Sequence, residues 1–225
     1  MLMLVLGKGK TGSLVAQVAR ERGHSVRVLD FHENQGARAL TAPTLAQIDV
    51  AIDFTNPEAA VENMRACLAL GGRIVVGTTG WLDKLDEMKA LAARKEGALV
   101  YGSNFSQGVQ ELFRLTGQLA KLDGFRFHIE ETHHTAKLDA PSGTALSLKK
   151  VITDVRPDAD VEIASKREGD HVGIHVVKAR CETDVFELRH EALSRRAFAE
   201  GAVKAAEWVG SKKGVWDFRD IFDQV

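Results

Sequence analysis

The sequence predicts an α/β fold in two parts: a doubly wound parallel sheet domain, followed by an α+β domain with a mixed open sheet. Short apolar runs alternate with amphipathic helical patterns through the first hundred residues, which is typical of parallel sheets. A glycine-rich turn joins the first apolar run to the first helical pattern. Later in the chain three strand-like segments follow one another, which indicates a mostly antiparallel or mixed sheet.

The N-terminal segment has the pattern of a dinucleotide-binding unit. An apolar run at Leu2–Leu6 precedes the glycine turn, a helical pattern follows, and a second strand at Val26–Leu29 ends at Asp30. Glycines let a pyrophosphate approach the backbone, the helix N-terminus faces the phosphates, and the acid can bind the adenosine ribose. The sequence therefore predicts a Rossmann-like domain. The residues expected to contact the cofactor are Gly7, Lys8, Gly9, Lys10, Thr11, Gly12 and Asp30.

The same turn has a partial similarity to a phosphate-binding P-loop. Gly9, Lys10 and Thr11 match the end of that motif, but the position five residues before Gly9 is Leu4 and not glycine. The spacing of the motif fails, so ATP hydrolysis is not expected.

Strands and helices continue to alternate up to residue 101. Strands are expected at Val50–Asp53, Arg73–Val76 and Ala98–Tyr101, with helices at Pro57–Leu70 and Leu82–Lys95. Ligands of such sheets sit beyond the carboxyl ends of the strands. The residues found there are small, polar or glycine-rich, and we expect them to line a cofactor site: Phe54, Thr55, Gly77, Thr78, Thr79, Gly102, Ser103, Asn104 and Phe105.

The second half begins with an amphipathic helical pattern from Val109 to Ala120. Alternating apolar residues at 125–129 then predict a strand that leads into a pair of histidines. Further helices are expected at Gly143–Val155 and Ser194–Val209, and further strands at Val161–Ala164, Gly173–Cys181 and Asp184–His190. His175 and His190 alternate with apolar neighbours and are expected to be structural or interface residues.

Residues 131–145 contain more reactive side chains than any other stretch of the chain. His133 and His134 are adjacent, and Lys137 follows three residues after the second histidine. Imidazole can give or take a proton near neutral pH, and an ammonium supplies a positive charge or a proton. The Pro-Ser-Gly-Thr run at 141–144 opens a helix, where backbone N–H groups can hold a carboxylate. The segment predicts acid–base chemistry on a small anion.

Composition favours a small-molecule partner. The net charge of −1 offers no broad basic field for nucleic acid or an anionic membrane. No apolar run approaches the roughly 18–20 residues that span a bilayer, and the N-terminal run lacks the basic segment and cleavage site of a leader peptide. Cys67 and Cys181 form no paired motif, so both are expected to be reduced core residues of a cytoplasmic protein.

These motifs together resemble the 4-hydroxy-tetrahydrodipicolinate reductase (dihydrodipicolinate reductase) family almost from end to end. The resemblance rests on the glycine turn, Asp53-Phe54-Thr55, Gly77-Thr78-Thr79-Gly80, Asn104-Phe105-Ser106-x-Gly108, the string from Glu131 to Ala145, Arg167-x-Gly169, Gly173-x-His175, Leu188-x-His190 and Ser194-Arg195.

The resemblance implies hydride transfer from NADH or NADPH to the cyclic imine intermediate of lysine and diaminopimelate synthesis, with loss of water. It also implies a dinucleotide-binding domain of residues 1–103 plus 195–225. Residues 104–194 would form a substrate-binding domain that builds a homotetramer.

Several site residues follow from the resemblance alone. It implies that His133 is the acid–base residue and Lys137 the proton donor. His134, Gly143 and Thr144 would bind a carboxylate of the dicarboxylate substrate, and the dipole of the helix that begins near Gly143 fits that role. Ser142 belongs to the same substrate-binding turn, where an N-cap role is expected rather than that of a nucleophile.

The residues after Asp30 bear on the choice of nucleotide. Phe31 and His32 stand where an arginine would clamp the 2′-phosphate of NADPH. We therefore expect a preference for NADH, with NADPH still used because His32, Arg38 or Lys8 could approach a 2′-phosphate.

Three alternatives are weighed against this reading. An amino-acid dehydrogenase of similar layout, acting on homoserine or aspartate, would not need the His-His-x-x-Lys and Pro-Ser-Gly-Thr motifs. A metal-dependent lyase or hydrolase using Glu131, His133 and His134 lacks the HExxH spacing, and adjacent strand residues point to opposite faces. A nucleotide sensor without catalytic activity is disfavoured because His133 and Lys137 are both present.

Overall fold

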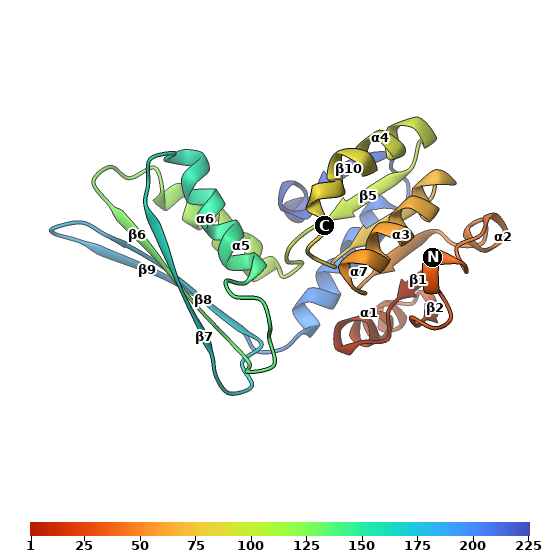
Figure 1. Cartoon of the computed structure of the whole chain (residues 1–225), viewed down its shortest axis with the longest axis horizontal. Coiled ribbons are helices and arrows are strands. Elements are labelled where there is room, and N and C mark those ends of the chain that lie inside the picture. The colour runs from red at the N-terminus through yellow and green to blue at the C-terminus, as the bar shows by residue number, and fades with distance from the viewer. The chain divides into compact units, whose positions relative to one another are not determined.

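The computed structural model describes all 225 residues, which form two compact units (Figure 1). Unit 1 contains Met1–Ser106 and Arg195–Val225, and unit 2 contains Gln107–Ser194. The first segment of unit 1 therefore ends at Ser106, directly before a helix, and the chain returns to this unit at Arg195.

Unit 1 is built on a six-stranded sheet in which every neighbouring pair is parallel. The order β10-β5-β4-β3-β1-β2 reverses at β1, which has β2 on one side and β3 on the other. The loops after β1 and β3 therefore diverge, and this is where such sheets bind ligands. The strands are β1 (Leu2–Leu6), β2 (Ser25–Leu29), β3 (Val50–Asp53), β4 (Arg73–Val76), β5 (Ala98–Tyr101) and β10 (Gly214–Asp217).

Helices cover both faces of this sheet. Alternate residues of β1 show why its apolar run is continuous: Met3 and Val5 belong to the core on one face, and Leu4 and Leu6 to the core on the other. The helices are α1 (Lys10–Glu21), α2 (Ala42–Leu45), α3 (Pro57–Ala69), α4 (Leu85–Lys95) and α7 (Arg196–Val209), with short 3₁₀ turns at Gln35–Ala37, Leu82–Lys84, Phe218–Asp220 and Phe222–Gln224.

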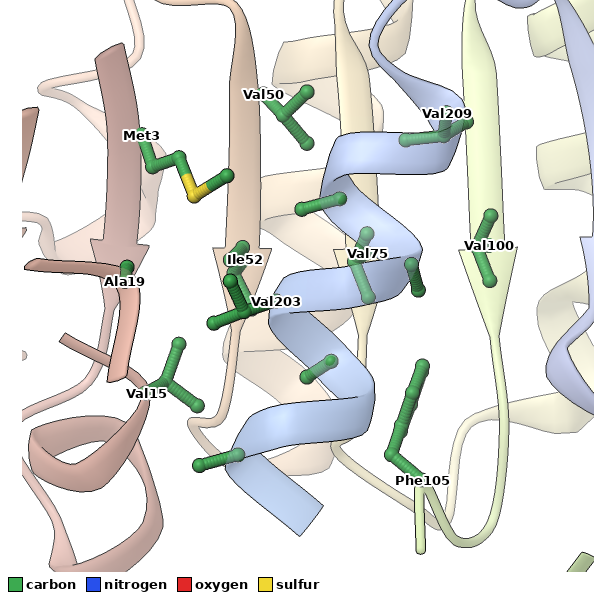
Figure 2. Close-up of a cluster of buried hydrophobic side chains, with 14 of the residues drawn as sticks. Met3, Val15, Ala19, Val50, Ile52, Val75, Val100, Phe105, Val203 and Val209 are labelled. Carbon is green, nitrogen blue, oxygen red and sulfur yellow. The ribbon is translucent and has the colours of Figure 1, made fainter. Parts of the chain in front are cut away.

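Helix α7 fills the first of these two cores. Figure 2 shows it lying across the sheet, with Val203 and Val209 among Ile52, Val75 and Val100 of the strands. Its buried face consists mostly of alanine, glycine and valine, which lets the helix approach the sheet closely.

Unit 2 is a four-stranded mixed sheet with two helices packed against it. The order is β7-β6-β8-β9; β6 and β7 are parallel and the other two pairs are antiparallel. Helices α5 and α6 lie together along one face (Figure 1), over a core that includes Phe127, Ile129 and Val177. The elements are α5 (Gln107–Leu119), β6 (Arg126–His133), α6 (Gly143–Val155), β7 (Val161–Arg167), β8 (Gly173–Arg180) and β9 (Val185–Ala192).

The structure departs from the sequence-based expectation at several places. Strand β10 was not predicted, because its four residues are only half-buried at the sheet edge. Strand β7 continues to Arg167, beyond the predicted end at Ala164. The expectation that Cys181 is a core residue is wrong: it lies in the turn after β8 and is partly exposed, whereas Cys67 is buried. None of the helices is long and apolar enough to cross a membrane.

Candidate active site

The turn after β1 requires glycine at two positions. Gly7 has φ +104°, and a Cβ there would lie 2.4 Å from the carbonyl oxygen of Phe54. A Cβ on Gly12 would lie 2.1 Å from the carbonyl oxygen of Gly7. The turn, the start of α1 and the loop after β3 therefore pack backbone against backbone, which only glycine permits.

The N-terminus of α1 suits an anion. Its N-cap residue is Gly9, which offers no side chain to cap the first turn. A Cβ added at Gly9 would meet nothing within 4 Å, so the space in front of these N–H groups is open. Lys8 and Lys10 are exposed beside it. Uncapped N–H groups at the positive end of a helix dipole form an anion site, so these residues fit the pyrophosphate of a dinucleotide.

Asp30, at the end of β2, is held by a residue that the sequence analysis did not single out. The backbone N–H of Asp30 donates to Glu33 Oε2 at 2.9 Å, and the N–H of Glu33 donates to Asp30 Oδ1 at 3.0 Å. Lys8 Nζ lies 3.4 Å from Asp30 Oδ2 and 3.2 Å from Glu33 Oε2. Hydrogen bonds to Glu33 and Asp30 raise the pKa of Lys8. The two carboxylates of Asp30 and Glu33 therefore share Lys8.

A pocket opens next to this ion cluster, at the carboxyl ends of β1, β2 and β3. Its empty volume is about 270 Å³, part of which is open solvent. The lining includes Gly7, Asp30, Phe31, Asn34, Thr55 and Asn63. The position matches the strand-order reversal, where an adenosine would bind beyond β2.

Beneath the pocket lies a buried polar network centred on Asp53. Its Oδ1 accepts hydrogen bonds from Thr78 Oγ1 at 2.7 Å, Thr55 Oγ1 at 2.8 Å and the N–H of Thr55 at 3.1 Å. Its Oδ2 accepts from Asn63 Nδ2 at 2.7 Å, and Asn63 Oδ1 accepts from Asn34 Nδ2 at 2.7 Å. Burial raises the pKa of Asp53, although these four donors act in the opposite direction. The network ties the loops after β2, β3 and β4 together.

The other predicted cofactor residues of unit 1 lie at the same edge of the sheet but differ in exposure. Thr79 is exposed, whereas Thr78 is buried in the Asp53 network. The ring of Phe54 fills the space beside Gly77, where a Cβ would lie 2.2 Å from it. Gly102 and Phe105 are buried and pack against Phe218, so Phe105 can offer a cofactor only its backbone. Ser103 and Asn104 are half-buried.

In unit 2, His133 is the last residue of β6 and is 7% exposed. Residues alternate between faces along the strand, so Glu131 lies on the same face and its Oε2 pairs with His133 Nδ1. Glu131 is 1% exposed and also binds Arg167 Nη2 at 2.8 Å and the N–H of Ser142 at 3.3 Å, both through Oε1.

The charges of this pair follow from its surroundings. Burial acts to raise the pKa of Glu131, but hydrogen bonds from Arg167, Ser165 and His133 outweigh it and lower the pKa to about 2. Burial lowers the pKa of His133 below its usual value, although the Glu131 carboxylate acts in the opposite direction. At neutral pH the site therefore holds a charged carboxylate beside an uncharged imidazole.

A second buried histidine stands against the first. The rings of His133 and His175 meet edge to face with centroids 5.1 Å apart. His175 Nε2 lies 3.2 Å from Ser142 Oγ, and burial lowers the pKa of His175 to about 3. Ser142 Oγ also accepts a hydrogen bond from the N–H of Ala145 at 3.2 Å, so Ser142 is the N-cap of α6.

Lys137 lies in the loop between β6 and α6. Its Nζ is 2.7 and 2.9 Å from the two carboxylate oxygens of Asp139, and its side chain is 23% exposed. Arg167 Nη2 donates to the carbonyl oxygen of Asp139 at 2.6 Å as well as to Glu131. The guanidinium therefore ties the lysine loop to the buried carboxylate.

The residues predicted to hold a substrate carboxylate surround the start of α6. Gly143 is the first residue of the helix, and a Cβ there would meet nothing within 4 Å. Thr144 is buried, and His134 is half-buried with its N–H bonded to the carbonyl oxygen of His171 at 2.9 Å. The positive end of the α6 dipole, with open space at Gly143, is able to hold a carboxylate.

One atom from each of Glu131, His133 and His175 lies within 4.8 Å of the others, a grouping that could in principle ligate a metal. Both oxygens of Glu131 already accept hydrogen bonds, and the Arg167 guanidinium adjoins them. A cation there would meet a fixed positive charge, so we do not assign these residues as metal ligands.

Sequence reasoning missed the supporting residues of both regions. Asn34, Asn63 and Glu33 have no motif, and their partners lie far along the chain or across a turn. His175 was expected to be structural or at an interface, and in the structure its ring contacts that of His133. The register that pairs Glu131 with His175 across β6 and β8 places it there, and a register is set by the folded sheet.

The parallel sheet with its glycine turn, and the buried acid–base cluster beside a helix N-terminus, define a dinucleotide-dependent oxidoreductase with a second, α+β unit. Residues 1–105 match the family model described as dihydrodipicolinate reductase, N-terminus, and residues 108–222 the one described as dihydrodipicolinate reductase, C-terminus. The chain belongs to the dihydrodipicolinate reductase family.

Known proteins agree with this assignment. A 4-hydroxy-tetrahydrodipicolinate reductase from Christiangramia forsetii is 34% identical over 242 residues, covering 100% of this chain and 99% of its own. The dipicolinate-bound dihydrodipicolinate reductase from Paenisporosarcina sp. TG-14 has the same fold, with a TM-score of 0.79, 24% identity, and coverage of 98% of this chain and 99% of its own. An aspartate dehydrogenase from Thermotoga maritima is more distant in fold, with a TM-score of 0.56, 13% identity, and coverage of 94% and 97%.

Proposed function

We propose that the protein catalyses the NAD(P)H-dependent reduction of 4-hydroxy-tetrahydrodipicolinate to tetrahydrodipicolinate, with loss of water, in lysine and diaminopimelate biosynthesis. Membership of the family supports the reaction, and full-length relatives carry the name of that reductase. The observation that carries the proposal is the cluster of His133, Lys137 and the open N-terminus of α6 in one short segment. Aspartate dehydrogenase shares the fold but lacks this degree of sequence similarity.

Each group in unit 2 has a chemical task in this proposal. The reduced nicotinamide supplies the hydride when the cofactor is bound. Lys137 Nζ donates the proton that the reduced substrate needs, and its charge offsets that of the dianion. His133 handles a proton through its imidazole. His134, Thr144 and the α6 N-terminus at Gly143 hold a carboxylate, and Ser142 keeps that terminus in place through its capping hydrogen bond.

We also propose that NADH is preferred over NADPH. Asp30 can accept hydrogen bonds from a ribose, and Glu33 adds a second carboxylate beside it. The only lysine next to them, Lys8, is already paired with both. A 2′-phosphate would therefore meet two negative charges and a neutralised cation. NADPH use would depend on Lys8 leaving this pair, or on His32 or Arg38.

We propose further that the protein is a homotetramer assembled through the sheet of unit 2. The face of this sheet away from α5 and α6 carries cross-strand pairs such as Lys178 with Glu130 at 2.7 Å and His128 with Glu162 at 3.6 Å. Exposed apolar residues on β9 and after it, Val185, Phe186 and Leu193, adjoin this sheet. The cytoplasmic location stays a prediction.

A coupled assay tests the function and the cofactor preference together. A dihydrodipicolinate synthase supplies the substrate, and the oxidation of NADH and of NADPH is followed separately. We expect turnover with both, and a higher kcat/KM with NADH. A strong preference for NADPH would contradict the cofactor proposal, and absence of turnover with either would contradict the function.

Two variants test the roles of the site residues. His133→Gln and Lys137→Ala should each lower kcat by about 10² or more, the usual contribution of a positioned acid or base, and should change NADH affinity little. Lys150→Ala on the exposed side of α6 is the matched control, because Lys150 pairs only with Asp154 on the same helix. Near wild-type turnover in both site variants would contradict the assigned roles.

A further inference from the structure

Glu131 is the most enclosed charged group of unit 2. It lies in the middle of the four-stranded sheet, opposite Ser165 on β7 and His175 on β8. The Glu131 side chain has no exposed surface. Neither the proposed function nor the resemblance to the family gives Glu131 a role. A buried carboxylate is costly unless its oxygens accept hydrogen bonds, so its partners indicate what it does.

The hydrogen-bond partners of Glu131 determine which ring nitrogen of His133 carries the proton. An ionised carboxylate can only accept hydrogen bonds, and Glu131 accepts from Arg167 and from the N–H of Ser142 through Oε1. Oε2 faces His133 Nδ1. For this contact to be a hydrogen bond, Nδ1 must carry the proton. In the uncharged imidazole the other nitrogen, Nε2, is then an acceptor with a free lone pair.

The other ring nitrogen of His133, Nε2, has no such partner. No hydrogen bond within the unit uses this atom, and Gly173, the first residue of β8, lies beside it. A Cβ on Gly173 would be 2.9 Å from Nε2 and 3.5 Å from His175 Cε1. Any side chain at position 173 would therefore press against the nitrogen that the carboxylate leaves unprotonated.

We propose that Glu131 is a positioning residue for His133: it fixes the tautomer with the proton on Nδ1 and directs Nε2 toward the substrate, while Gly173 keeps the space at Nε2 open. The inference rests on the proposed function of His133. It adds that the acid–base nitrogen is Nε2, and that the carboxylate acts through the histidine and does not touch the substrate.

Other charged and titratable groups also face His133, and they set the sign of the pH effect. The Glu131 charge raises the pKa of His133, whereas Lys137 and Arg167 lower it. The ring of His175 also faces it, and burial keeps that ring uncharged. Removing the carboxylate charge should therefore move the His133 limb of the pH profile of kcat/KM to lower pH.

The direct test is a proton-detected ¹⁵N NMR spectrum of the ring nitrogens of the wild-type protein, assigned by loss of the signal in His133→Gln. We expect the proton of His133 on Nδ1 at neutral pH. A proton on Nε2 would overturn the inference. This measurement uses no substrate, so it stands apart from the coupled assay, in which an inactive wild-type enzyme would refute the proposed function instead.

Kinetics of Glu131→Gln provide the second test. We expect kcat to fall by about 10-fold to 100-fold and the KM for NADH to stay within about twofold. The His133 limb of the pH profile of kcat/KM should shift to lower pH. The matched control is Asp154→Asn on the exposed side of α6, where the carboxylate pairs with Lys150; its kinetics should match the wild type. Wild-type kcat and pH profile in Glu131→Gln would contradict a positioning role.

Gly173→Ala keeps the inference testable if Glu131→Gln does not fold. This variant retains the carboxylate and its hydrogen bonds and adds one methyl group beside Nε2. Turnover should fall at least 10-fold while the proton of His133 stays on Nδ1. Unchanged turnover would show that Nε2 is not the working nitrogen.

Discussion

His133 and His175 illustrate how two histidines of one buried cluster acquire different properties. His133 has a carboxylate at Nδ1, which opposes the effect of burial on its pKa. His175 has a hydroxyl at Nε2 and no partner at Nδ1, so burial outweighs the opposing effect of the Glu131 charge and the pKa of His175 falls to about 3. The carboxylate therefore favours the protonated form of the first histidine, whereas the second is a neutral contact at physiological pH.

The lowered pKa of His175 predicts a loss of stability in mild acid. The unfolded chain binds a proton at this histidine near pH 6.5, while the folded chain resists it down to about pH 3. The stability that the neutral ring provides is therefore complete above 6.5 and is lost as the pH falls toward 3, by at most about 1.4 kcal/mol per pH unit.

Urea unfolding at pH 7, 6 and 5 measures this effect. His175→Gln, which can still bind Ser142, should weaken the pH dependence in this range, whereas Gln118→Ala on the exposed side of α5 should not. In the folded state Glu131 stays charged over this range, because its pKa is lowered from 4.5 to about 2. Its titration in the unfolded state is the same in both proteins. An equally steep loss in His175→Gln and wild type would contradict the assignment.

Among the elements, α7 shows how closely a helix can approach a sheet when the side chains on its inner face are small. Gly201 lies against the backbone of Phe105, and a Cβ there would be 1.8 Å from the carbonyl oxygen. Phe105 follows β5 and belongs to the same core as α7. This contact therefore holds the loop after β5, with Ser103 and Asn104, against the helix that returns to unit 1.

Gly201→Ala should destabilise the protein although alanine favours helices. The methyl group would have to displace α7 or the Phe105 backbone, which costs about 1–3 kcal/mol or more. Gly117→Ala in α5 is the matched control, because its Cβ would meet only Val151 Cγ1 at 3.5 Å, an ordinary contact, and should stabilise by up to about 1 kcal/mol. Melting temperatures compare the two; equal values would contradict the close-packing argument.

At the scale of the whole molecule, the two units have different surfaces. The sheet of unit 1 is covered by helices on both faces, whereas that of unit 2 has helices on one face only (Figure 1). A sheet face without helices is available to pack on the same face of another copy, and closed symmetric assemblies are the usual form of homo-oligomers.

The tetramer proposal predicts a mass of four times the 24.6 kDa chain in native mass spectrometry and light scattering. Glu130→Lys places two like charges together on the uncovered face, next to Lys178, and should yield smaller species. Lys150→Glu on α6, away from that face, is the control and should leave the mass unchanged. A wild-type mass equal to one chain would contradict the proposal.

The local patterns of the chain predicted most of its helices and strands and the fold class of each unit. The apolar run at Leu2–Leu6, the glycine turn and the helical pattern behind it lie within one short segment, so their relation needs no long-range information. The His-His-x-x-Lys and Pro-Ser-Gly-Thr motifs are equally local. Strand β10 was not predicted, because a short, half-buried edge strand shows little alternation of apolar and polar residues.

What the sequence by itself determined is therefore the α/β class, the order of nearly all helices and strands, and the residues able to carry acid–base chemistry. The tertiary structure alone decided how those residues are supported. Asn63 joins Asp53 to Asn34, and His175 meets His133, because a sheet register and a helix packing bring them together from distant parts of the chain. Such contacts depend on three-dimensional packing, which no local pattern contains.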